Sequence, residues 1–267
     1  RWCRGLGRLA APLFFYALAV GFHHTRNRKK YLLRLYLANV GMVFFNQIMR
    51  MLQRKLDYVA YQPKNHNIFT TLFCAGVLIC IWENRKEKKK FFTYIGIYIF
   101  WQAMVMGLAI LAEAFDYVWR GNALLQTVLR TNYIFPLLGG IWDAEGGVFF
   151  IVLGVWLYCA VENKWKLALR YILFCGAYMF MCQGDILYRI MSRFSFWGYH
   201  KLADVIYFGS SFVGIPLGTS DLSLLTEFYQ WMMIGALPIM LSCNGKRGKS
   251  LKWLFYAAYP LQFLVLY

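Results

Sequence analysis

Long apolar blocks, each bounded by short clusters of lysine and arginine, constrain the fold of this chain more than any other feature. The 267 residues are 60% hydrophobic and only 15% charged, whereas soluble domains average about 45–50% apolar and about 25% charged residues. The blocks are long enough to cross a bilayer. Because lipid offers the backbone no hydrogen-bond partners, each block must be a helix. The sequence predicts an all-α fold, a polytopic transmembrane helical bundle, with residues 1–267 as a single domain.

Eight spans are predicted, and the segment 184–224 is expected to be re-entrant, interfacial or half of a two-span hairpin. The spans cover residues 6–24, 31–49, 67–83, 91–112, 136–161, 166–183, 225–243 and 252–267. The basic loops, which alternate with less basic ones, are expected on the cytoplasmic side; they are residues 26–30, 84–90, 162–166 and 244–249. The first residues look like a loop that enters a helix, so we expect a preceding helix that this sequence lacks.

The net charge of +17 does not indicate a nucleic-acid-binding protein. The cations cluster at the ends of apolar blocks, which is typical of membrane topology, rather than along one face of a soluble fold. The seven cysteines show no CxxC spacing, so neither a disulfide framework nor a metal site is predicted. The sequence also has no GxSxG, HExxH or Walker motif.

The stretch GFHHTRNRKKYLLRL, residues 21–35, has two interpretations. His24 could act as a general base near neutral pH, and the following cations could hold an anionic ligand. Alternatively, the histidines are interfacial and the cations only set the topology. Arg34 lies one turn inside the second predicted span, where it could pair with a carboxylate or a phosphate.

Charged residues also lie at two further places inside predicted spans: Arg8 in the first, and Asp143 with Glu145 in the fifth. Arg8 either snorkels to the headgroups or has a functional role. Asp143 and Glu145, in GGIWDAEGG, either coordinate an amine or form an ordinary helix cap. Because glycines flank the two acids, we expect the helix to be kinked or unwound there.

Three segments together resemble the signature of the TraX family of conjugal-transfer membrane proteins. GRLAAPLFFYALAVGFHHTRNRKKYLLRL is similar to the family's Gly-Arg-x-Ala-x-Pro, Gly-Phe-x-His-Thr and Lys/Arg-x-Tyr-x-x-Arg-Leu runs. NHNIFTTL (65–72) resembles its Asn-Ile/Val-Phe-x-Thr-Leu helix start. NGKRGKSLKWLFYAAYPLQFLVLY (244–267) is similar to its carboxyl-terminal signature.

The resemblance implies a membrane-embedded acyltransferase that moves an acetyl group from acetyl-CoA to an amine, such as the amino terminus of a small pilin-like membrane peptide. It also implies a multi-pass protein of the bacterial cytoplasmic membrane, with the lipid bilayer as a partner. The site residues it indicates are His24 and Asp143 for catalysis, His23, Arg28, Lys29 and Arg34 for the donor, and Arg8, Asn67, Tyr259 and Gln262 for the acceptor.

Two departures from the family pattern leave other functions open. The family's Asp-His-Ile pair belongs to a helix that precedes this sequence, and Gln262 stands where the family has a histidine. Glutamine can form hydrogen bonds but cannot titrate. The alternatives are a carbohydrate O-acyltransferase and a non-catalytic membrane assembly or transport protein.

Overall fold

The computed structural model describes residues 2–56, 67–118, 131–183, 193, 199–215, 229–243, 257 and 261. These residues form helices and turns, with one isolated parallel bridge between Asn67 and Ala144 and no strand. The all-α prediction is therefore confirmed. The chain divides into two compact units: unit 1 contains residues 1–26 and 146–244, and unit 2 contains residues 27–145 and 245–267.

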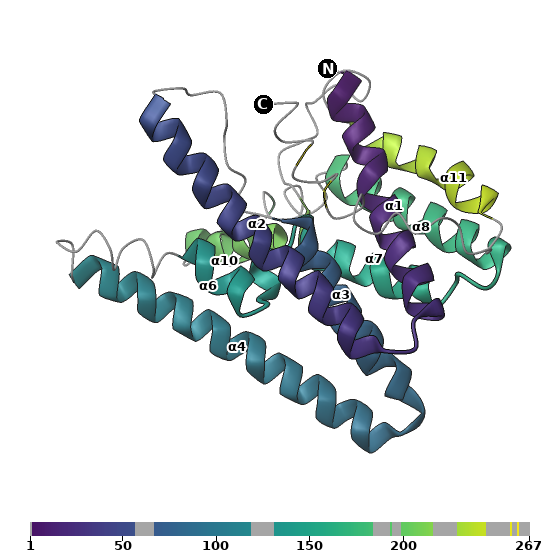
Figure 1. Ribbon diagram of the computed structural model, residues 1–267, viewed down its shortest axis with the longest axis horizontal. Coiled ribbons are helices and arrows are strands. Elements are labelled where there is room, and N and C mark those ends of the chain that lie inside the picture. The colour runs from purple at the N-terminus through teal and green to yellow at the C-terminus, as the bar shows by residue number, and fades with distance from the viewer. Residues whose placement is uncertain are drawn as a thin grey trace. The chain divides into compact units, whose positions relative to one another are not determined.

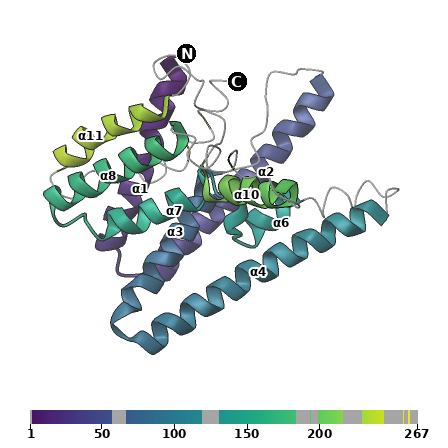
Figure 2. The ribbon, with the colours of Figure 1, turned by 180° about the vertical axis from the view of Figure 1, so that it is seen from behind.

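Unit 2 is organised around a buried helix. Its elements are α2 (Arg28–Leu56), α3 (Ile68–Glu83), η1 (Asn84–Lys86), α4 (Lys88–Val118), α6 (Thr131–Leu137) and η2 (Ile141–Asp143). Figures 1 and 2 both show α2 and α3 side by side. Most residues of α3 are buried, including Leu72 and Ile79 at 0% exposure, whereas Phe100 on α4 is 72% exposed. An exposed apolar face of this kind suits contact with lipid.

Unit 1 packs shorter helices around an aromatic core. Its elements are α1 (Trp2–His24), α7 (Gly147–Tyr158), α8 (Lys164–Gln183), α10 (Tyr199–Val213), η3 (Tyr229–Gly235) and α11 (Ala236–Ser242). The ring of Phe150 lies edge-on to Phe174 and Tyr178, with centroids 5.7 and 5.5 Å away, and 5.9 Å from that of Phe15 on α1. Aromatic contacts therefore tie α1, α7 and α8 together.

Among the described residues, four helices are long and apolar enough to cross a membrane, by length and composition. They contain residues Arg28–Met49, Ile68–Lys86, Lys88–Ala112 and Lys164–Cys182, and they match four of the predicted spans. The first predicted span, 6–24, is also helical, within α1. Segment 184–224 contains the 15-residue helix α10, which is too short to span a bilayer. The predicted span 252–267 lies outside the described residues, apart from two isolated positions.

Two predicted spans are interrupted; unwinding was expected near the glycines of the first, and no interruption was predicted in the second. Within 136–161, helix α6 ends at Leu137, the chain passes through η2, and α7 begins only at Gly147. Gly139 and Gly146 have φ values of 66° and 77°, which end the regular helix because a left-handed residue cannot continue it. Within 225–243, the 3₁₀ helix η3 precedes the short helix α11.

A glycine contact fixes α10 against the start of α7. Gly214 has a φ of 91°, and a Cβ atom added there would collide with the carbonyl oxygen of Gly146. We expect Gly214→Ala to lower the thermal unfolding temperature, because backbone strain of this kind costs about 1–3 kcal/mol before any clash is counted. Gly209→Ala, with open space around its Cβ, is the control in the same helix. Equal melting curves for the two variants would contradict this account.

Candidate functional site

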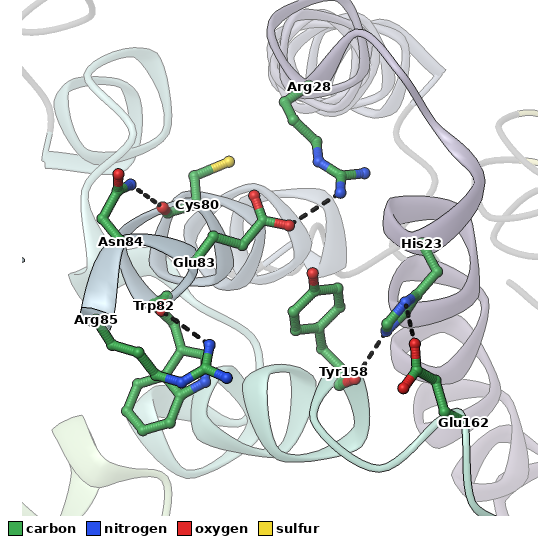
Figure 3. Close-up of polar contacts among 9 residues, drawn as sticks. All are labelled: His23, Arg28, Cys80, Trp82, Glu83, Asn84, Arg85, Tyr158 and Glu162. Atoms are coloured by element: carbon green, nitrogen blue, oxygen red, sulfur yellow. Dashed lines mark hydrogen bonds and ion pairs between the residues drawn. The ribbon is translucent and has the colours of Figure 1, made fainter. Parts of the chain in front are cut away.

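His23 is held near the end of α1 by groups from the end of α7 and the turn that follows it. Its Nε2 lies 3.0 Å from the carbonyl oxygen of Tyr158, and its Nδ1 lies 3.7 Å from a carboxylate oxygen of Glu162 (Figure 3). The ring also stacks on the Tyr158 ring, with centroids 4.4 Å apart. Because a carbonyl oxygen only accepts hydrogen bonds, Nε2 carries the hydrogen in this pair. Protein groups on both ring nitrogens therefore orient the side chain.

The neighbouring His24 has the opposite environment. It is the last residue of α1, and its side chain is exposed. Its imidazole is therefore open to a reactant, while His23 anchors the same helix end. An exposed imidazole next to an anchored one can accept a proton from an amine or hydroxyl without first breaking a protein contact.

The start of α2 in unit 2 presents several cations with different partners. Asn27 caps the helix: its side-chain oxygen accepts from the backbone N–H of Lys30 at 3.0 Å. Arg28 Nη2 donates to a carboxylate oxygen of Glu83 at 2.9 Å, and both side chains are about two-thirds buried, with exposures of 29% and 31% (Figure 3). Lys29 and Arg34 have exposed side chains. The charge of Arg28 is thus compensated within the protein, whereas Lys29 and Arg34 face outward.

The acidic segment near residue 143 lies in the helix break rather than in a continuous span. Asp143 ends η2, and its side chain lies outside the described part of the chain. Ala144 forms the parallel bridge with Asn67, and the carbonyl oxygen of Glu145 accepts from the Thr71 hydroxyl at 3.1 Å. The expected unwinding between the glycines is confirmed.

Side chains from two helices, α2 and α4, satisfy the backbone groups that the break leaves without helical partners. The Tyr36 hydroxyl donates to the carbonyl of Leu137 at 2.7 Å, and the Trp101 indole donates to that of Leu138 at 3.0 Å. Gln102 acts twice: its amide N–H donates to the Gly139 carbonyl at 3.2 Å, and its oxygen accepts from the Ile141 N–H at 2.8 Å. Unwound backbone is tolerated at membrane depth only where it finds such partners.

A buried amide pair lies at the centre of this arrangement. Asn39 and Asn67 are 0% and 3% exposed. The Asn39 oxygen accepts from Asn67 Nδ2 at 2.6 Å and from the Thr70 hydroxyl at 2.8 Å, and its Nδ2 donates to the Pro136 carbonyl at 2.6 Å. Asn67 also caps α3, because its side-chain oxygen accepts from the Phe69 N–H at 2.7 Å. We call Asn39, Asn67 and Thr70 the amide cluster.

The predicted site residues therefore separate into several places. Arg8, His23 and His24 lie on α1, where Arg8 is exposed and 16 residues before His24, about 24 Å along the axis. Arg28, Lys29 and Arg34 share the first turns of α2. Asn67 is buried beside the acidic segment, where its observed contacts are structural; its role in substrate binding stays a prediction. Tyr259 and Gln262 lie outside the described residues.

Four residues that matter for this arrangement were missed in the sequence. Asn39 and Gln102 are amides within apolar blocks, and such residues are costly in a membrane unless they have partners. Glu83 and Glu162 are acids beside basic loops, a pattern that is compatible with pairing. A polar or acidic residue in or beside an apolar block indicates that it needs a partner. The sequence does not identify that partner, because it depends on how distant helices pack.

Comparison with known families gives a match over most of the chain. The family model for TraX, described as TraX protein, matches residues 1–178, which is 178 of 267 residues. The match includes the amino-terminal segments on which the resemblance was based, and it extends through α7 and most of α8. The carboxyl-terminal segment 244–267 lies beyond it. Searches of curated proteins and of solved structures give no significant match.

Proposed function

The chain belongs to the TraX family, and we propose that it is an acetyl-CoA-dependent acyltransferase of the bacterial cytoplasmic membrane that acetylates an amine, such as a peptide amino terminus. Four helices long and apolar enough to cross a membrane support its assignment as a membrane protein. The observation that carries the proposal is the histidine pair at the end of α1. His23 is anchored by Tyr158 and Glu162, and His24, which matches the histidine of the family's Gly-Phe-x-His-Thr pattern, is exposed.

In the proposed reaction, the acceptor nitrogen attacks the thioester carbonyl carbon of acetyl-CoA. An amide bond forms, the bond from carbon to sulfur breaks, and CoA leaves as the thiol or thiolate. His24 accepts the proton that the amine loses. His23 acts as a positioning residue, because its contacts with Tyr158 and Glu162 fix the helix end that carries His24. Asp143 stays a predicted catalytic residue.

The cations at the start of α2 are proposed to bind the phosphates of the donor. Lys29 and Arg34 are exposed, and Lys30 and Arg34 are four residues apart, so they lie on one helix face. Arg28 contributes less positive charge than the sequence predicts, because Glu83 compensates it. We therefore assign donor binding chiefly to Lys29, Lys30 and Arg34, with Arg28 maintaining the contact between α2 and α3.

Arginine geometry gives a test of donor binding. Arg34→Lys keeps the charge but loses the planar guanidinium that can bind a phosphate through two N–H groups. We expect this variant to bind acetyl-CoA about tenfold more weakly, equivalent to about 1.4 kcal/mol, by isothermal titration calorimetry in detergent. Lys201→Ala, an exposed cation on α10 of unit 1, is the control. If Arg34→Lys and Lys29→Ala/Lys30→Ala both bind acetyl-CoA with wild-type affinity, these cations do not bind the donor and only set the membrane topology.

A further inference from the structure

The turn between α3 and α4 lies at the boundary between membrane and water. It connects two stretches that are long and apolar enough to cross a membrane, Ile68–Lys86 and Lys88–Ala112, which only Glu87 separates. Because both helices must leave the hydrocarbon here, the turn is placed at the level of the lipid headgroups. We call residues 84–90, NRKEKKK, the basic turn.

The basic turn has more cations than the nearby carboxylates can neutralise. Its own carboxylate, Glu87, pairs with Lys90 at 2.7 Å, and the adjacent Glu83 pairs with Arg28 at 2.9 Å. The other cations of the turn are exposed and form no ion pair within the described residues; they are Arg85, Lys86, Lys88 and Lys89. Four uncompensated cations within five residues favour an anionic partner.

Hydrogen bonds hold the backbone of the basic turn, and aromatic side chains pack on either side of it. Asn84 donates to the Cys80 carbonyl at 2.8 Å, and Glu87 N–H donates to the Asn84 carbonyl at 3.0 Å. Arg85 donates to the Trp82 carbonyl at 3.3 Å, and its guanidinium lies 5.3 Å from the centre of the Trp82 ring (Figure 3). Trp82 also contacts Phe91 edge-on. The cations therefore project from an ordered turn.

The aromatic residues around the turn indicate which anion it meets. Trp82 is 37% exposed and Phe92 is 66% exposed; tryptophan is enriched at membrane interfaces, and an exposed phenylalanine beside it offers further apolar surface. Exposed aromatic rings beside uncompensated cations suit a phospholipid, whose headgroup is polar and whose chains are apolar. Polybasic segments next to a membrane helix attract anionic lipids.

We propose that the basic turn is a binding surface for the phosphate headgroups of anionic phospholipids, with Arg85, Lys86, Lys88 and Lys89 as the contacting cations. Trp82 and Phe92 would contact the upper parts of the acyl chains. This surface is separate from the proposed catalytic role of the histidine pair, so it stands whether or not the protein transfers acetyl groups.

The test measures lipid preference directly. Purified protein in detergent is mixed with phosphatidylglycerol and phosphatidylcholine, and bound lipid is counted by native mass spectrometry for wild type and for Lys86→Gln/Lys88→Gln/Lys89→Gln. We expect the preference for phosphatidylglycerol to fall by about tenfold or more in this variant, and to weaken for wild type at high salt. The substituted side chains are exposed, so an unchanged melting temperature in phosphatidylcholine is expected.

A matched triple variant separates the possible outcomes. Lys29→Gln/Lys30→Gln/Arg34→Gln removes the same charge from the start of α2 in the same unit, and we expect it to retain most of the lipid preference. Unchanged preference in the basic-turn variant, or an equal loss in both variants, would overturn the proposal. A third result would also overturn it: acetyl-CoA displaces phosphatidylglycerol from the wild-type protein, and the basic-turn variant loses affinity for acetyl-CoA. The turn would then bind the acetyl donor and not lipid.

Discussion

Replacing Asn39 with leucine is expected to destabilise the protein by about 3 kcal/mol. The substitution removes three hydrogen bonds at once, with Asn67, Thr70 and the Pro136 carbonyl. A buried polar group left without a partner costs about 1–3 kcal/mol. Leucine is apolar enough for the membrane, so the loss would come from the abandoned partners and not from poorer insertion.

Graded variants distinguish the amide cluster from general packing. Thr70→Val removes only one of the three bonds and should cost about 1 kcal/mol. Leu37→Ala, on the same helix at 57% exposure, should cost less than either, because little buried contact is lost. The measurement is thermal unfolding in detergent, followed by intrinsic fluorescence. If Asn39→Leu has the same melting temperature as the wild-type protein, the amide cluster does not hold the helix break in place.

The second large effect is expected at His24. His24→Ala should lower the rate of acetyl transfer by about 100-fold to 10,000-fold, the range typical of a lost general acid or base. Its affinity for acetyl-CoA should stay within about twofold, since the cations of α2 are unchanged. The side chain is exposed, so the melting temperature should also be close to that of wild type.

His23 provides the comparison within the same pair. His23→Ala should reduce transfer less than His24→Ala and should also lower the melting temperature, because it removes the contacts with Tyr158 and Glu162. His23→Gln should restore much of the stability, since its side-chain amide N–H can donate to the Tyr158 carbonyl in place of the imidazole Nε2. If His23→Ala instead abolishes acetyl transfer and His24→Ala leaves it unchanged, the two proposed roles are exchanged.

The helical class and most helix positions follow from the sequence because apolar length and basic flanks are local properties. α3 and α4 begin within three residues of the predicted spans 67–83 and 91–112. The break after Leu137 was only partly predictable. The glycines around Asp143 indicated a kinked or unwound entry to the span 136–161, but they did not indicate where one helix ends and the next begins, because the hydrophobicity continues through the break.

The candidate site was less predictable because it depends on partners far apart in the chain. The sequence marked His23, His24 and the α2 cations, but nothing local tells that Glu83 neutralises Arg28, 55 residues away. Asn67 was predicted to bind substrate from a family pattern, whereas its observed contacts are with Asn39 and the start of α3. A side chain's role changes with its partners, and these are set by tertiary packing.

The most direct test of the central proposal is acetyl transfer by the purified protein. The protein in detergent is incubated with acetyl-CoA labelled in the acetyl group and a short peptide with a free amino terminus; peptide mass and free CoA thiol are followed together. We predict a labelled acetyl group on the peptide amino terminus and an equal amount of released CoA, both lost in His24→Ala. Folded wild-type protein that neither acetylates the peptide nor releases CoA above the rate without enzyme would contradict the proposal.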